Sequence, residues 1–246
     1  MSWLVDPDAV AAEYASEQAL RERVLAHREL VEGPDDEAIV RARVLAARPR
    51  RLVEVGSGLG DFCAWARATL GGEVVAVDAS PRMVELAVQP GVEAVVADMR
   101  QLPFADAAFD CVVANFVLYH IPDPVIAIAE FARVLEPGGI LVASTLSDDT
   151  DSRLQAWATL FREEKQPAPP PLSFSRENGR ALLLSQFRHV EQTDCDAVLV
   201  FPTRERLARY VEAVPRMKGT ASLLPEIAEP FRLPDRTTVF QASAPR

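Results

Sequence analysis

Short apolar runs alternate with amphipathic stretches between residues 51 and 145. The apolar runs are Leu52–Val55, Val74–Val77, Val92–Val96, Phe109–Ala114 and Ile140–Ser144. Apolar residues recur at helical spacing in the intervening stretches Phe62–Leu70, Pro81–Ala87 and Pro124–Leu135. Continuous valine-rich strands separated by short helices predict a parallel sheet that is covered by helices on both faces.

The flanks of this region follow different patterns. A first helix is predicted from Pro7, capped by Asp6, to Leu30, and a second from Asp36 to Ala47. Beyond Thr145 the predicted elements are helices at Ser152–Glu164, Asn178–Gln186 and Thr203–Val214, an extended linker at Gln166–Pro171, and strands from Phe187, at Val198–Phe201 and at Thr237–Ala242. The predicted fold class is α/β: a doubly wound, Rossmann-like, mostly parallel seven-stranded sheet with helices on both faces and a helical cap.

Composition narrows the possible partners. The 246 residues carry a formal net charge of −10, and no long run of Lys and Arg is present, so we expect no nucleic-acid partner. Cys63, Cys111 and Cys195 form no CxxC pair and predict reduced thiols in a cytoplasmic protein. We find no signal peptide, no apolar run that could span a membrane and no His, Cys or Asp cluster with metal-ligand spacing, so we expect neither a membrane association nor a metal.

The strongest chemical signal is the segment VEVGSGLGD, which follows one predicted strand and opens a helix. Its glycines, Gly56, Gly58 and Gly60, let the backbone turn tightly and let a ligand approach closely. A dinucleotide fingerprint requires Gly or Ala at position 61, where this chain has Asp61, and this argues against a dehydrogenase. The alternative is a tight turn that binds nothing.

Polar residues also follow the next predicted strands. Asp78 lies 20 residues beyond Gly58, the spacing expected of an acid that binds a ribose, although it could instead cap the helix at Pro81. Asp98 and Asn115 follow the third and fourth strands. Ligands of open α/β sheets bind beyond the carboxyl ends of the strands, so these four features predict one site.

Together these segments resemble the class I S-adenosylmethionine-dependent methyltransferases, and most closely the small-molecule group that includes ubiquinone and menaquinone methyltransferases. The resemblance covers Arg51 to Thr145, and its motifs are Val53–Phe62, Val74–Ala87, Ala97–Asp123 and Phe131–Thr145. It implies S-adenosylmethionine as cofactor, S-adenosylhomocysteine as product and a small-molecule methyl acceptor. It divides the chain into an N-terminal helical cap (1–47), a cofactor-binding core (48–147) and a C-terminal part with cap helices and the last strands (148–246).

The resemblance also implies roles for individual residues. The methionine part of the cofactor would lie against Gly56, Ser57 and Gly58, and its ribose would bind Asp78. The adenine would lie between Ala79 and Met83, with its amino group on Asp98 and a ring nitrogen on the Met99 N–H. Asn115 and Phe116 would lie under the sulfonium, and Glu54 would orient the glycine loop or a water. Tyr14 or an arginine of the first helix would contact the methionine carboxylate, unless that helix is an ordinary solvated one.

Catalysis by this family needs little acid–base chemistry, because the leaving group is a neutral thioether. Alignment of the acceptor can contribute roughly 7–11 kcal/mol, and a base is needed only where the acceptor must lose a proton. His120 is the best base candidate, followed by Tyr119, although the resemblance also allows a structural His120. Aromatic residues that could line the acceptor pocket, or else belong to the core, are Trp157, Phe161, Phe174 and Tyr210. Alternative functions are an RNA or protein methyltransferase and a cofactor-binding protein without turnover.

Overall fold

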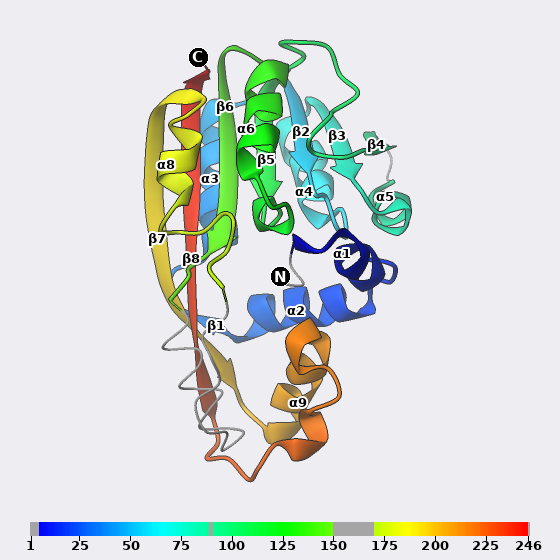
Figure 1. Ribbon diagram of the computed structural model, residues 1–246, viewed down its shortest axis with the longest axis vertical. Helices are drawn as coiled ribbons and strands as arrows, with labels where there is room; N and C mark the ends of the chain where they lie inside the picture. The colour runs from blue at the N-terminus through cyan, green and yellow to red at the C-terminus, as the bar shows by residue number, and fades with distance from the viewer. Residues whose placement is uncertain (1–4, 89–90, 150–169, 246) are drawn as a thin grey trace.

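The computed structural model describes residues 5–88, 91–149 and 170–245. In this part of the chain an α/β fold is built on one sheet with the strand order β1-β7-β8-β6-β5-β2-β3-β4 (Figure 1). The strands β2, β3, β4, β5 and β6 are parallel neighbours, and β8 is antiparallel to β6 and β7. The predicted fold class is confirmed, with eight strands rather than seven because the two-residue β1 (Val31–Glu32) pairs with β7.

The central strands follow the apolar runs closely. Their bounds are Arg51–Val55 (β2), Glu73–Asp78 (β3), Val92–Val96 (β4), Phe109–Asn115 (β5) and Leu135–Leu146 (β6). Strand β6 was predicted to begin at Ile140, after a helix that reached Leu135. The helix instead ends at Val134, and the strand carries the Pro-Gly-Gly segment as an irregularity in its pairing with β5.

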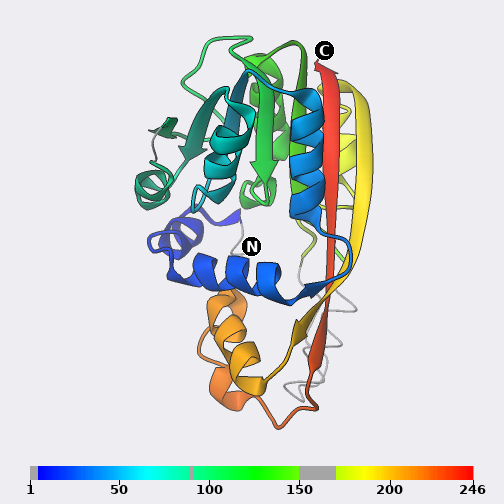
Figure 2. The same ribbon diagram turned by 180° about the vertical axis from the view of Figure 1, so that it is seen from behind.

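Two helical layers cover the sheet. The helices α3 (Asp36–Ala47), α4 (Asp61–Leu70) and α5 (Pro81–Ala87) bury their apolar side chains against one face, and α6 (Pro124–Val134) and α8 (Gly179–Leu183) cover the other (Figures 1 and 2). Strand residues contribute to both cores: Val53 and Val112 pack on the α6 side, and Leu52 and Val113 on the α4 side. This double burial explains why the strands are continuously apolar.

The last two strands form a long ribbon that extends past the carboxyl ends of the central strands, the edge that we call the rim of the sheet. Strand β7 (Phe187–Phe201) pairs with β8 (Phe231–Pro245) over their whole length, and α9 (Arg204–Ala213) packs at the far end of the ribbon. The prediction of two short strands in place of β7, and of a final strand limited to Thr237–Ala242, was wrong. Continuous cross-strand pairing keeps the polar middle of β7 extended.

The N-terminal segment forms two helices rather than the single predicted one. Asp6 caps α1 (Pro7–Glu13) as expected, but the chain leaves the helix at Tyr14 and a second helix, α2 (Gln18–Leu30), follows. The break frees the carbonyl of Tyr14, which accepts a hydrogen bond of 2.8 Å from the Ser80 hydroxyl. Helix α2 then crosses below the carboxyl ends of the central strands (Figure 1). The predicted helix at Ser152–Glu164 and most of the linker at Gln166–Pro171 lie outside the described residues.

Candidate functional site

The glycine turn lies where β2 ends and α4 begins. Gly56, Gly58 and Gly60 adopt φ values of 78°, 50° and 77°, which residues with a Cβ rarely adopt. A Cβ on Gly56 would lie 2.4 Å from Cγ2 of Val117, and one on Gly58 would lie 3.3 Å from Cδ2 of Leu20. The turn is therefore tight on its inner side, and on its outer side it faces the cap helix α2.

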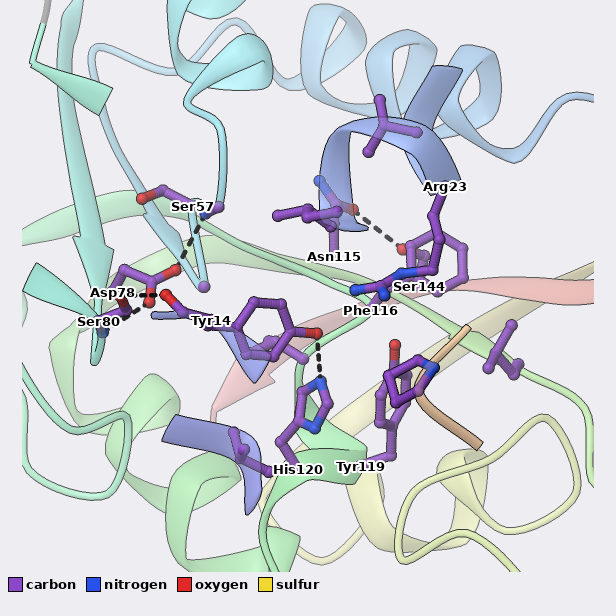
Figure 3. A pocket seen from close by; sticks show the side chains of 18 of the residues that line it. Tyr14, Arg23, Ser57, Asp78, Ser80, Asn115, Phe116, Tyr119, His120 and Ser144 are labelled. Atoms are coloured by element: carbon purple, nitrogen blue, oxygen red, sulfur yellow. Dashed lines mark hydrogen bonds between the residues drawn. The ribbon is translucent and has the colours of Figure 1, made fainter. Parts of the chain in front are cut away.

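Asp78 connects this turn to the end of β3. One of its carboxylate oxygens accepts the Gly58 N–H at 3.0 Å, and the other accepts the Ser80 N–H at 2.9 Å (Figure 3). Burial raises the pKa of Asp78, although the backbone N–H groups act to lower it. The alternative role as cap of the helix at Pro81 is wrong, because Ser80 is the N-cap of α5. Each oxygen keeps further lone pairs for a ligand in the cavity.

A buried hydrogen-bonded chain runs along the rim from β2 to β6. Glu54, 3% exposed, accepts from the Cys63 thiol at 3.0 Å and from the Asn115 amide at 3.3 Å, and Asn115 in turn accepts from the Ser144 hydroxyl at 3.1 Å. Burial raises the pKa of Glu54 to about 8. The hydrogen bonds of Glu54 thus reach Cys63 and Asn115, and its expected role in orienting the glycine loop or a water stays a prediction.

The cap places Tyr14 opposite the short helix η2 (Leu118–His120). The Tyr14 hydroxyl lies 3.0 Å from Nε2 of His120, and the two side chains point toward one another (Figure 3). Burial raises the pKa of Tyr14 to about 12, so its phenol stays neutral at physiological pH. Tyr119 is buried, with its ring centroid 4.6 Å from that of His120.

One cavity of about 1800 Å³ brings the predicted site residues together. It is lined by Tyr14, Glu54, Gly56, Ser57, Gly58, Asp78, Ala79, Asp98, Met99, Asn115, Phe116, Tyr119 and His120. Met83 is not on the lining and is fully buried. Asp98 lines the cavity but its carboxylate also forms an ion pair with Arg100 at 2.6 Å, which lowers its pKa. The buried Ser57 hydroxyl has no hydrogen-bond partner among the described residues.

The far side of the cavity departs from the sequence predictions. Tyr210 lines it, as expected of an acceptor pocket. Phe174 does not: it is fully buried, with its ring 5.6 Å from that of Phe240, because the segment before α8 packs into the core. Trp157 and Phe161 lie outside the described residues.

Sequence reasoning missed several polar residues of the lining. His27, Asp36, Asp235 and Thr237 come from α2, α3 and β8 and meet on one side of the cavity. They are distant in the sequence and match no spacing pattern, so only the tertiary fold reveals them. Phe116 adopts a φ of 51°, a left-handed conformation that the sequence does not signal.

Three further observations concern metal ions, membranes and thiols. In residues 5–88, 91–149 and 170–245 no group of three His, Cys, Asp or Glu side chains could hold a metal ion, and no helix is long and apolar enough to cross a membrane. Cys63, Cys111 and Cys195 are free and buried in the structure.

Comparison with known proteins agrees with this geometry. A family model described as a methyltransferase domain matches residues 53–143. A demethylmenaquinone methyltransferase of Deinococcus radiodurans is 30% identical over 179 residues, which is 70% of each chain. Another, of Mycobacterium sp. (strain KMS), is 34% identical over 146 residues, so the chain spans 59% of that relative's length.

A solved structure gives the same fold. It is a Haemonchus contortus N-methyltransferase in complex with phosphomonomethylethanolamine and S-adenosylhomocysteine, with a TM-score of 0.55 and 18% identity over 87% of this chain and 54% of that one. The fold is that of a Rossmann-like methyltransferase. The chain belongs to the class I S-adenosylmethionine-dependent methyltransferases.

Proposed function

We propose that the protein transfers the methyl group of S-adenosylmethionine to a small-molecule acceptor by in-line displacement, mainly by positioning the two reactants. The observation that carries this proposal is the glycine turn with Asp78 at the rim, inside a cavity large enough for both reactants. The buried Ser57 hydroxyl without a partner fits a ligand at this position, since such a group is costly unless hydrogen-bonded.

The residues at the rim supply distinct parts of a cofactor site. Asp78 offers acceptor lone pairs to the ribose hydroxyls, and Gly56, Ser57 and Gly58 let the methionine part approach the backbone. Ala79, Asp98 and Met99 stand at the adenine end. We assign Tyr14 to the closing cap.

S-adenosylmethionine supplies a methyl group on a sulfonium, whose leaving group needs no protonation. The protein must hold the acceptor in line with that group and exclude water, which contributes roughly 7–11 kcal/mol. The Glu54–Asn115–Ser144 chain fixes the rim below the methyl position. His120, held by Tyr14, can take a proton from an acceptor that must lose one.

The acceptor side of the cavity is built largely from elements outside the region that matches the methyltransferase family. The family model matches residues 53–143, whereas α2, α3, α9 and β8 contribute much of the acceptor side of the cavity. The lining is rich in apolar side chains, and a small acceptor with an apolar body fits it.

Calorimetric titration with S-adenosylhomocysteine tests the identity of the cofactor, and a separate titration with NAD tests the alternative cofactor class. Binding of S-adenosylhomocysteine and not of NAD is expected, and binding of NAD alone would refute the proposal. Incubation with labelled S-adenosylmethionine and a metabolite extract then tests turnover. Label in a small-molecule fraction is expected; label only in RNA or protein, or in no fraction, would contradict it.

The variant Gly58→Asp tests where the cofactor binds. The added carboxylate would occupy the space against Leu20 and repel Asp78, so we expect affinity for S-adenosylhomocysteine to fall at least 100-fold. Gly138→Asp is the matched control, because Gly138 also has a positive φ (91°) but a Cβ there meets nothing within 4 Å. Equal affinities of the two variants would place the ligand elsewhere.

A further inference from the structure

A second polar group lies in the same cavity, away from the glycine turn. His27 of α2, Asp36 of α3, and Asp235 and Thr237 of β8 all line the cavity, and all lie outside the matched family region 53–143. Strand β8 is separated from β2 by β6 and β5, so three strand spacings, about 14 Å, lie between the two strands. We call these four residues the β8 subsite.

His27 of the β8 subsite is already paired with a carboxylate. Nε2 of His27 lies 2.7 Å from a carboxylate oxygen of Asp235, which is buried. Burial acts to lower the pKa of His27, but the hydrogen bond and charge of Asp235 outweigh it, and the pKa lies above its ordinary value. His27 therefore already occupies one of the two carboxylates, that of Asp235.

Asp36 is the second carboxylate, and it has an unused oxygen. The residue is 3% exposed, and its Oδ2 has no hydrogen-bond partner within the described residues. Burial raises its pKa, while the charge of His27 and a hydrogen bond with Thr237 lower it. The helix does not need this side chain as a cap, because Asp35 already accepts the Ala38 N–H. A buried acceptor without a donor, on a residue that lines the cavity, favours a ligand that donates.

The surroundings add negative charge. Arg28, the nearest lining cation along α2, is paired with Glu37 and with Asp61, at 2.9 Å from the latter. Asp35 also acts electrostatically on both His27 and Asp36. Hence a cationic donor suits the β8 subsite better than a neutral one.

We propose that the β8 subsite binds a protonated amine of the methyl acceptor, with Asp36 Oδ2 accepting one of its N–H groups. This inference rests on the proposed function for the identity of the ligand as an acceptor. The bound ammonium group holds the acceptor in place and is not itself methylated, because a protonated nitrogen has no lone pair for attack. The acceptor class is thus a small molecule with an amino group and a separate nucleophilic atom.

The test compares two probes of nearly equal shape, 2-phenylethylamine and 2-phenylethanol. Each is titrated calorimetrically into the protein saturated with S-adenosylhomocysteine, at pH 7.5. The amine is expected to bind at least tenfold more tightly than the alcohol. Asp36→Asn is expected to weaken amine binding at least tenfold and to change alcohol binding less than twofold.

Glu93→Gln is the matched control, since it removes the same charge from an exposed position of β4 outside the cavity lining. It should change neither affinity more than twofold. Thr237→Val is the second variant: loss of the hydroxyl releases Asp36 from one partner, and we expect amine binding to change while the alcohol is unaffected. Thermal unfolding and affinity for S-adenosylhomocysteine show whether each variant is folded.

Several outcomes would overturn the inference. These are no detectable binding of the amine, equal binding of amine and alcohol, or unchanged amine affinity in folded Asp36→Asn. Failure of S-adenosylhomocysteine to bind would instead refute the proposed function. In that case titration of the amine into the cofactor-free protein still tests the β8 subsite, so the two failures are distinguishable.

Discussion

Replacement of Glu54 by Gln should change how the stability of the protein depends on pH. Glu54 is enclosed between Cys63 and Asn115 at the end of β2, and burial raises its pKa from 4.5 to about 8. The folded protein therefore keeps a proton on Glu54 that the unfolded chain releases near pH 4.5. Since the folded state binds more protons between these two values, its free energy of unfolding falls as pH rises through this window.

The magnitude follows from the size of the shift. The difference between 4.5 and about 8 is some 3.5 pKa units, and one unit corresponds to about 1.36 kcal/mol, which gives a loss on the order of 4–5 kcal/mol between pH 4.5 and pH 8. Glu54→Gln does not titrate, and its amide oxygen can still accept from Asn115. We expect the variant to gain stability relative to the wild type by several kcal/mol between pH 5 and pH 9.

Urea unfolding of the cofactor-free protein at pH 5, 7 and 9 measures this difference. Other titratable groups contribute equally to both proteins and cancel in the comparison. Glu93→Gln provides the control for a lost carboxylate at an exposed position. Parallel stability curves for the wild type and Glu54→Gln would show that Glu54 is ionised in the fold and would refute this reasoning.

Two other substitutions test the cap and the core. Tyr14→Phe removes the hydrogen bond to His120 and should lower the free energy of unfolding by about 1 kcal/mol in urea titrations; no loss of stability would mean that this contact does not hold the cap. Phe174→Ala should cost about 3–5 kcal/mol, because its fully buried ring packs on Phe240, and a loss below 1 kcal/mol would contradict its place in the core.

The sequence predicted the half of the site that local chain geometry determines. The glycines at positions 56, 58 and 60 and the acid at position 78 lie next to strands, and a strand followed by a tight turn fixes where such residues point. The ends of neighbouring parallel strands must meet at one rim, so the line from Gly58 through Asp78 and Asp98 to Asn115 could be drawn without a structure. The actual cavity lining contains all four residues.

Residues beyond the local pattern could not be placed in this way. Glu54 was expected to orient the glycine loop or a water, and the sequence did not signal its partners on α4 and β5, which only packing between layers brings together. An aromatic side chain such as Phe174 suits a pocket or a core equally well. Which of the two it joins depends on how the segment before α8 folds back. The predicted lengths of β7 and β8 were too short, because pairing between these two distant strands keeps a locally polar sequence extended.

Helix α2 shows why the sequence predicts one half of the cavity lining and not the other. Leu20, Arg23, Val24 and His27 all line the cavity, at the spacing of one helix face. The sequence left open whether this was a solvated amphipathic helix, because the same spacing suits either surface.

The two ends of that face meet different parts of the molecule. Leu20 lies against the glycine turn, and His27 lies against Asp235 of β8. Seven residues of helix separate them, a rise of about 10 Å, and two turns return the side chains to the same side. If the cofactor lies at the glycine turn and the amine of the acceptor at the β8 subsite, as we propose, the length of α2 between Leu20 and His27 sets the distance between the two reactants and limits which acceptors the protein can align.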